Sequence, residues 1–271
     1  MKKRIACFFT GGYTELYGMT QFLKKINGEA GFIKLTPTRE RKSKEDIRNR
    51  ARHMEMISKR ESGLTGKKLI DHVKNFVQEE RFKEERYDMI LIEDDKDDRF
   101  LTIQADGTAA IDEKEWETFK QEVQEQLQKA GVTIPIIMIM AAPEVEAWFL
   151  ADWDNSFGQE YRQILSNDQN QYFSTKFRIH INEEILTERY KNDIESYGYF
   201  DSQYVKLSER IQKSLEEIDF MGGYSGEYPT ESVRYSKTKN GGRMLANIEP
   251  QSVLQKCPHC FREGYYKLQE L

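Results

Sequence analysis

This sequence has few cysteines and no excess of positive charge. The 271 residues include 3 cysteines, a small and odd number that excludes a disulfide scaffold and is typical of a reducing compartment. Lys and Arg together number 41 against 46 Asp and Glu, which gives a net charge of -5. This balance excludes a histone-like protein whose whole surface is basic and binds nucleic-acid phosphates. Nucleic acid could therefore bind only at a local basic patch.

Long apolar runs are also absent. The N-terminal run at 5–9 is too short for the hydrophobic part of a signal peptide. The longest later stretch, 134–142, contains Pro135 and is far short of a membrane span. An aromatic content of 12% nevertheless argues against wholesale disorder. We therefore expect a folded cytoplasmic protein that makes no membrane contact.

Short segments that are apolar at every position predict a parallel sheet. They lie at 5–9, 89–92 and 136–140, with 32–35 as a fourth candidate. Such runs are typical of strands that are buried on both faces. Segments with helical spacing of apolar residues separate them, at 14–26, 67–81 and 113–130. The alternation predicts an α/β fold with a parallel sheet flanked by helices.

The pattern changes after about residue 155. Aromatic residues, Asn and Gln become frequent, and strand-like apolar runs disappear. A helical pattern is present at 205–218, with apolar residues on one face. We therefore expect an α/β domain at 1–155 and a mostly helical extension at 156–271.

Acidic side chains directly follow two of the predicted strands. One group comes after Ile92 and the other after Met140; they comprise Glu93, Asp94, Asp95, Asp97, Asp98, Glu144 and Glu146. The carboxyl ends of parallel strands are where open α/β sheets place their sites, so neighbouring strands would bring both groups together. Clustered carboxylates repel one another unless a cation is present, and oxygen ligands favour Mg²⁺ or Mn²⁺.

Strand alternation selects candidate ligands within the first group. If the chain stays extended, Glu93, Asp95 and Asp97 point one way, and Asp94 and Asp98 point the other way. We expect the first three to be the metal ligands, although a shift of one residue in the register would exchange the two sets.

Both acidic groups also have a purely structural interpretation. Residues 94–98 could be an ordinary solvated loop. Pro143 fits the first position of a helix, and acidic residues just after it would complement the helix dipole. The occurrence of acidic groups at two strand ends is what favours a shared site.

The segment 10–15 after the first strand contains Gly11 and Gly12 and opens a helix. Glycine permits close approach of the backbone, and a helix N-terminus attracts anions, so a phosphate-binding loop of the flavodoxin kind is one hypothesis. A tight strand-to-helix turn capped by Thr14 is the alternative.

Two basic segments could contact a polyanion. Residues 39–61 carry a net charge of +4 and could form a solvated helix or an arm. The second segment has no acidic residue and mixes glycine and tyrosine with four cations, which are Arg234, Lys237, Lys239 and Arg243. Its composition is suited to nucleic-acid backbone contact, and a solvated loop is the alternative. The motif at 257–260 contains two cysteines and a histidine but lacks a second pair, so we expect no zinc site.

Several segments together resemble an uncharacterised family of bacterial Toprim-like proteins. The matching motifs are Gly12-Tyr13-Thr14-Glu15, Ile92-Glu93-Asp94-Asp95-Lys96-Asp97, Pro143-Glu144-Val145-Glu146-Ala147-Trp148-Phe149-Leu150-Ala151-Asp152, Tyr235-Ser236-Lys237 with Gly242, and Cys257-Pro258-His259. The Toprim fold occurs in topoisomerases, primases, and OLD-type and ribosomal-RNA-maturing nucleases.

The resemblance implies Mg²⁺-dependent (or Mn²⁺-dependent) phosphodiester cleavage in bacterial defence or repair. Nucleic acid would be the substrate, and an ATPase would be a plausible protein partner by analogy with the wider fold. The implied metal ligands are Glu93, Asp95 and Asp97, and the implied catalytic residues are Glu15, Glu144 and Glu146.

The chain departs from the family pattern at two positions. The family has a glutamate where this chain has Gly11, and an aspartate where it has Glu93. Glu15 could supply the missing carboxylate from one turn into the helix. The departure at Gly11 favours the alternative hypothesis, in which a catalytically weakened scaffold binds a nucleotide or a protein partner.

Overall fold

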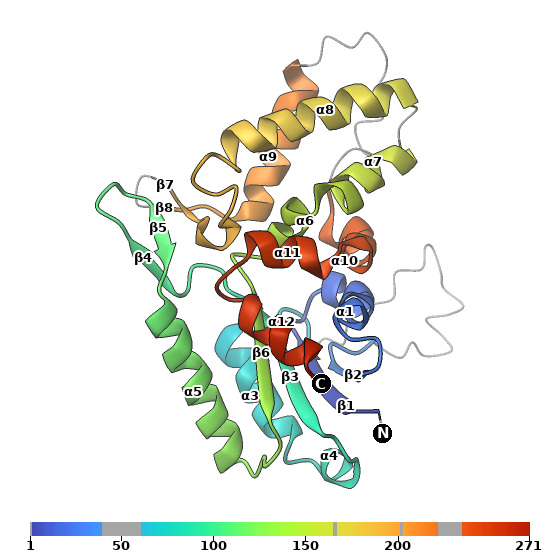
Figure 1. Ribbon diagram of the computed structural model, residues 1–271, viewed down its shortest axis with the longest axis vertical. Coiled ribbons are helices and arrows are strands. Elements are labelled where there is room, and N and C mark those ends of the chain that lie inside the picture. Colours follow the sequence, from blue (N-terminus) through green and yellow to red (C-terminus); the bar gives the residue numbers. More distant parts are fainter. Residues whose placement is uncertain (1, 40–60, 165–166, 201–202, 222–234) are drawn as a thin grey trace.

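A four-stranded parallel sheet forms the centre of the protein (Figure 1). The computed structural model describes residues 2–39, 61–164, 167–200, 203–221 and 235–271. The strands are β1 (Arg4–Phe9), β2 (Gly31–Thr36), β3 (Met89–Asp95) and β6 (Ile136–Ala141), in the order β2-β1-β3-β6. The predicted strands are confirmed, and the fold is α/β, as the Toprim-like resemblance implies.

Each strand contributes to two hydrophobic layers, one on each face of the sheet. Cys7 and Leu91 belong to the layer that includes α1 (Tyr13–Ile26). Phe8 and Ile92 belong to the opposite layer. Because side chains alternate along a strand, burial on both faces makes the strand apolar at every position, which is the pattern seen in the sequence.

Helices cover both faces of the sheet. The layer opposite α1 is formed by α3 (Gly66–Phe76) and α5 (Glu113–Lys129), and α4 (Glu80–Glu84) is a short exposed helix. The single helix expected at 67–81 is thus two helices. Between β3 and α5, β4 (Leu101–Ile103) and β5 (Ala109–Ile111) form an antiparallel hairpin. The side chain of Asp112 accepts a 2.9 Å hydrogen bond from the Glu115 N–H and caps α5.

The chain after β6 is mostly helical, as expected. Its elements are α6 (Glu146–Ala151), η1 (Trp153–Asn155), α7 (Phe157–Ile164), α8 (Asn167–Glu184), η2 (Ile194–Ser196), β7 (Tyr199–Phe200), β8 (Gln203–Tyr204), α9 (Leu207–Met221), η3 (Lys237–Gly241), α10 (Gly242–Asn247), α11 (Pro250–Lys256) and α12 (Arg262–Gln269). The predicted domain boundary near residue 155 falls between η1 and α7 and stays a prediction. Within the described part of the chain, every helix is too short or too polar to span a bilayer.

The C-terminal helices pack directly on the sheet layer that contains α1 (Figure 1). Gly18 of α1 lies against α10, where an added Cβ would sit 2.6 Å from the Leu245 Cβ. Gly264 of α12 lies against β6, where an added Cβ would sit 2.8 Å from the Met138 carbonyl oxygen. These close approaches hold η3, which precedes α10, near the carboxyl ends of the strands.

Candidate functional site at the carboxyl ends of the strands

The two acidic segments meet at one edge of the sheet. β3 and β6 are parallel neighbours, and Asp95 is in register with Ala141. The Val145 N–H, in the segment after β6, donates a 3.2 Å hydrogen bond to Asp95 Oδ1. Glu93, Glu144 and Asp95 thus come from two strand ends that are adjacent in space, as the sequence predicts.

Neighbouring acids of β3 have different roles because they lie on opposite faces of the sheet. Glu93 and Asp95 follow the alternation of Leu91 and face the α1 layer. Asp94 faces the other layer, where it accepts 3.0 Å hydrogen bonds from the Gly66 N–H at the start of α3 and pairs with Arg99 at 2.6 Å. Asp94 is therefore a structural residue that joins β3 to α3.

The expected alignment of Asp97 with the other two candidate ligands is wrong. β3 ends at Asp95, and Asp97 has a positive φ of 52°, so the chain does not stay extended. Asp97 pairs with Lys206 at 3.6 Å and is partly exposed. The solvated-loop interpretation of 94–98 fits Asp98, which is exposed, but fails for Asp94, which is fully buried.

Glu15 supplies a carboxylate from the start of α1. An added Cβ on Gly12 would lie 2.0 Å from Glu15 Oε2, so the carboxylate folds back over the first turn of its helix. Its pKa is raised to about 7, mainly by burial, with opposing contributions from Lys237 and Glu146. These electrostatic neighbours place Glu15 with the residues of the strand ends.

The loop before α1 is not arranged as an open phosphate site. The Gly11 N–H donates to the Leu64 carbonyl and the Gly12 N–H to the Thr10 carbonyl, so both amides are already bonded. The helix begins at Tyr13 with Gly12 as its N-cap, so the expected Thr14 cap is wrong.

Lys237 pairs with both glutamates of the acidic group that follows β6. Its Nζ lies 3.1 Å from Glu144 Oε1 and 3.1 Å from Glu146 Oε2. The Thr14 hydroxyl of α1 donates a 3.4 Å hydrogen bond to the Lys237 carbonyl oxygen. The Tyr235 hydroxyl donates a 2.7 Å hydrogen bond to Glu146 Oε1. The segment that leads into η3 therefore contacts the acidic residues that follow β6.

The start of α9 holds Glu144 in place. The N–H and hydroxyl of Ser208 both donate 2.9 Å hydrogen bonds to Glu144 Oε2. Sequence reasoning did not identify Ser208, although a serine at the start of a predicted helix is a usual capping signal. Helix α6 begins at Glu146, not at Pro143, and the hydrogen bonds of Glu144 run to another helix. An interaction of Glu144 and Glu146 with the dipole of the helix that follows them therefore does not explain the contacts that Glu144 makes.

Burial and mutual repulsion shift the titration of these carboxylates. Burial, and then Glu15 and Asp95, raise the pKa of Glu93 well above its usual value. Burial also raises the pKa of Asp95, opposed by Lys237. Burial alone would raise the pKa of Glu144, but Lys237 and the Ser208 donors hold it below its usual value. We call Glu15, Glu93, Asp95, Glu144 and Glu146 the carboxylate pocket.

The predicted nucleic-acid-binding residues have different environments. Lys239 is exposed. Arg243 forms hydrogen bonds of 3.1 and 2.7 Å with both oxygens of the buried Glu160, so its guanidinium also has a structural role. Arg234 and most of the basic segment 39–61 lie outside the described residues.

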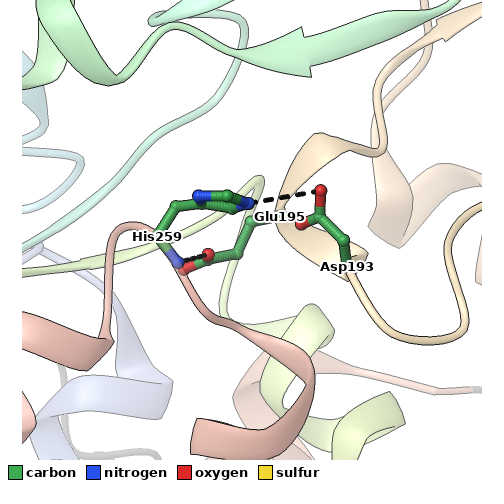
Figure 2. A group of neighbouring side chains, drawn as sticks. All are labelled: Asp193, Glu195 and His259. Carbon is green, nitrogen blue, oxygen red and sulfur yellow. Dashed lines mark hydrogen bonds and ion pairs between the residues drawn. The ribbon is translucent and has the colours of Figure 1, made fainter.

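A second group of ligand-type side chains combines residues at η2 with one that precedes α12 (Figure 2). Oxygen or nitrogen atoms of Asp193, Glu195 and His259 all lie within 4.8 Å of one another, close enough to hold a metal ion. Among the described residues this is the one group of three or more ligand-type side chains within 4.8 Å of one another, so the members of the carboxylate pocket are spaced more widely. No sequence pattern pointed to Asp193 and Glu195, which are remote from His259 along the chain.

The atoms of this second group are engaged with the protein itself. Glu195 accepts hydrogen bonds from three consecutive backbone N–H groups that lead into α12, those of His259, Cys260 and Phe261. His259 Nδ1 lies 2.7 Å from Glu113, and its Nε2 lies 3.5 Å from Asp193. The hydrogen bond with Asp193 and that with Glu113 raise the pKa of His259 to about 9, against the effect of burial. A protonated imidazole here links α5, η2 and α12.

The carboxylate pocket contains only oxygen ligands, the type that hard divalent cations prefer, but among the described residues no three of its carboxylates come within 4.8 Å of one another. Glu93 is fully buried, and its Oε1 has no hydrogen-bond partner among the described residues. A buried carboxylate oxygen without a partner is costly, and a bound cation would satisfy it. Fold and site thus define an α/β protein with a carboxylate pocket at the carboxyl edge of its sheet. Comparison of the chain with protein-family models, curated proteins and solved structures finds no match.

Proposed function

We propose that this chain is a Toprim-like, Mg²⁺-dependent nuclease or nuclease-like protein that acts on nucleic-acid phosphodiesters. The observation that carries the proposal is the convergence of carboxylates from three remote segments at one sheet edge. Asp95 reaches the segment of Glu144 through the Val145 N–H, and Lys237 pairs with both Glu144 and Glu146. Such a combination of acids and one cation suits a metal ion and a phosphate together.

The composition of the pocket supports Mg²⁺ or Mn²⁺ over softer metals. All five candidate donors are carboxylates, and hard cations prefer such oxygen ligands. Glu93 and Asp95 would hold the ion, with Asp97 at the edge of the site. When bound, the ion would neutralise phosphate charge and lower the pKa of a coordinated water.

The other side chains have complementary roles in this proposal. Glu15 has a pKa of about 7, which suits a group that accepts a proton near neutral pH. Glu144 and Glu146 would orient the attacking water. Lys237 would contact the phosphate, and Lys239 and Arg243 would contact the backbone farther away. A role in bacterial defence or repair, beside an ATPase partner, remains part of the proposal by analogy.

A cleavage assay tests the proposal directly. Plasmid DNA and RNA would be incubated with the protein in Mg²⁺, in Mn²⁺ and in EDTA. We expect metal-dependent cutting that is lost in Asp95→Ala and in Glu144→Ala. Asp98→Ala is the matched control, because Asp98 is an exposed acid of the same segment and should cut normally. Full activity of both pocket variants would refute the assignment of the site.

The binding-scaffold alternative is favoured by one specific observation. An added Cβ on Gly11 would lie 1.9 Å from the Glu61 carbonyl oxygen, so the family's glutamate has no room at this position. If Glu15 does not replace it, the chain would bind a nucleotide or a protein partner without cleaving. Saturable nucleotide binding, with no cutting in any metal, would support this alternative.

A further inference from the structure

We propose that a strip of surface across α1 binds the phosphate backbone of a nucleic-acid strand, and that Tyr17 and Arg39 belong to it. The strip consists of Arg39 at the end of β2, Tyr17 of α1, Lys239 of η3 and Arg243 of α10, and we call it the basic strip. The inference rests on the nucleic-acid substrate of the proposed function and adds the path of the strand on the protein.

Cations outnumber acids in the segments that form the basic strip. α10, α1 and β2 lie side by side in this order (Figure 1). Segments 13–26, 31–39 and 235–248 carry one acidic residue and seven basic ones, which are Lys24, Lys25, Lys34, Arg39, Lys237, Lys239 and Arg243. The acidic residue, Glu15, is 3% exposed and belongs to the carboxylate pocket. Because the whole chain has a net charge of -5, this surface is a local exception of the kind that phosphate binding requires.

Glu61 and Glu160 border the basic strip, and both are buried. Glu61 accepts 2.6 Å hydrogen bonds from the N–H and the hydroxyl of Thr38. Glu160 accepts hydrogen bonds of 3.1 and 2.7 Å from Arg243. Both carboxylates are thus bonded inside the protein, and neither is exposed on the strip.

Tyr17 connects the two ends of the basic strip. The guanidinium carbon of Arg39 lies 5.2 Å from the centroid of the Tyr17 ring. On the other side, an added Cβ on Gly242 would sit 2.6 Å from the Tyr17 Cβ, so the backbone of α10 lies directly against Tyr17. Lys239 precedes Gly242 by three positions, and both Lys239 and Arg39 are exposed. The strip therefore leads from η3 across α1 to the end of β2.

The position of Arg39 on an aromatic ring suits phosphate binding. A guanidinium has a rigid fork of N–H donors that matches the oxygens of a phosphate. Contact with the Tyr17 ring restricts the Arg39 side chain before any ligand arrives. Less conformational freedom is then lost when the guanidinium binds a phosphate.

The basic strip also begins beside the carboxylate pocket. The Thr14 hydroxyl of α1 donates to the Lys237 carbonyl oxygen at 3.4 Å, and the Lys237 ammonium pairs with Glu144 at 3.1 Å. Lys237 and Lys239 are two positions apart in η3. A strand held on the strip would therefore pass the pocket at Lys237, where the proposed function places a phosphate.

Fluorescence anisotropy with a labelled single-stranded DNA oligonucleotide tests the inference without cleavage. The full-length protein would be titrated in EDTA at several salt concentrations. We expect Arg39→Gln to weaken binding about fivefold and to reduce the salt slope by about one, because one phosphate contact is lost. Tyr17→Leu should also weaken binding, because Arg39 loses its aromatic support. Lys24→Gln is the matched control, since it removes one exposed charge from the last turn of α1 and should bind like the wild-type chain.

Circular dichroism would show that each variant is folded. Wild-type affinity in a folded Arg39→Gln chain would overturn the inference. An equal loss in Lys24→Gln would also overturn it, because the effect would then depend on net charge and not on the basic strip. Both results leave nucleic-acid cleavage possible. Absence of binding by the wild-type chain, in EDTA and with added Mg²⁺, would overturn both the inference and the nucleic-acid substrate of the proposed function.

Discussion

The Val145 N–H donates a 3.2 Å hydrogen bond to Asp95 Oδ1, and the two residues are 50 positions apart in the chain. This bond ties the end of β3 to the segment after β6, so that Glu93 and Asp95 share a pocket with Glu144. Parallel pairing of the two strands makes the contact possible, because both carboxyl ends then lie at the same edge.

Asp94 and Asp95 should respond in opposite ways to the same substitution. Asp94→Asn removes the charge that pairs with Arg99, and we expect it to destabilise the fold by about 2 kcal/mol. The loss of stability should be limited, because burial disfavours the charged form of Asp94 and raises its pKa. Burial therefore already offsets part of the stabilisation that the ion pair with Arg99 provides. Asp95→Asn should leave stability unchanged or increase it, because burial and repulsion from Glu15, Glu144 and Glu146 together disfavour the charge more than Lys237 favours it.

Urea denaturation and the cleavage assay measure the two effects separately. Asp95→Asn should abolish metal-dependent cutting, and Asp94→Asn should keep it at temperatures where the variant is folded. Equal stability losses in both variants would contradict the assignment of the two aspartates to opposite faces.

Gly12→Ala should separate activity from stability. The backbone at Gly12 has φ -107° and ψ 160°, which alanine can adopt, so the stability loss should be at most about 1 kcal/mol. The new Cβ would displace the Glu15 carboxylate, whose Oε2 lies 2.0 Å from that point. Cleavage should fall at least about tenfold, because a carboxylate of the pocket is moved.

Gly28→Ala is the control for this substitution. Gly28 is exposed, and the nearest atom to an added Cβ is 3.6 Å away. Cleavage by this variant should match that of the wild-type chain. Normal cleavage by Gly12→Ala would show that Glu15 is not needed in the pocket.

His259 should make the fold less stable at alkaline pH. Its pKa is raised from 6.5 to about 9 by Asp193 and Glu113, so its stabilising effect is complete below pH 6.5. The effect is lost as the pH rises through 9, when the imidazolium gives up its proton. We expect a loss of about 2 kcal/mol over this interval, comparable with other charged hydrogen bonds.

Thermal denaturation of the wild-type chain and His259→Gln from neutral to alkaline pH would measure this effect. The variant should be less stable at neutral pH, and the difference between the two proteins should shrink toward high pH. A difference that is constant with pH would show that His259 is neutral in the folded protein. Glu195 keeps its backbone hydrogen bonds in both proteins and does not contribute to the comparison.

Lys239 and Arg243 should have different effects on stability but similar effects on nucleic-acid binding. Arg243→Met leaves the buried Glu160 without its ion pair and should destabilise the fold by about 1 to 2 kcal/mol. The loss should be no larger, because the Arg243 side chain is 59% exposed and solvent screens its charge. Lys239→Met should change stability by less than about 0.5 kcal/mol. Fluorescence anisotropy with a labelled oligonucleotide at several salt concentrations should show weaker binding and a smaller salt dependence for both variants.

Local sequence patterns were sufficient for the architecture of the sheet. Runs that are apolar at every position identify β1, β3 and β6, because strands buried on both faces leave no position for a polar side chain. The same reasoning places acidic groups at one sheet edge, and the alternation correctly separates Asp94 from Glu93 and Asp95. It fails at Asp97, because the positive φ of that residue ends the extended chain.

The sequence by itself determined the parallel sheet, the helices that cover it and the position of acidic residues at two strand ends, because these depend on periodicity and chain order, whereas the adjacency of β3 and β6 came from the structure. Only the tertiary structure decided which groups complete the pocket. Lys237, Ser208 and Tyr235 reach Glu144 or Glu146 from helices and loops whose packing no local pattern encodes. The same holds for His259 between Asp193 and Glu113. Such contacts depend on how remote surfaces fit together, and that fit is set by packing of the whole chain.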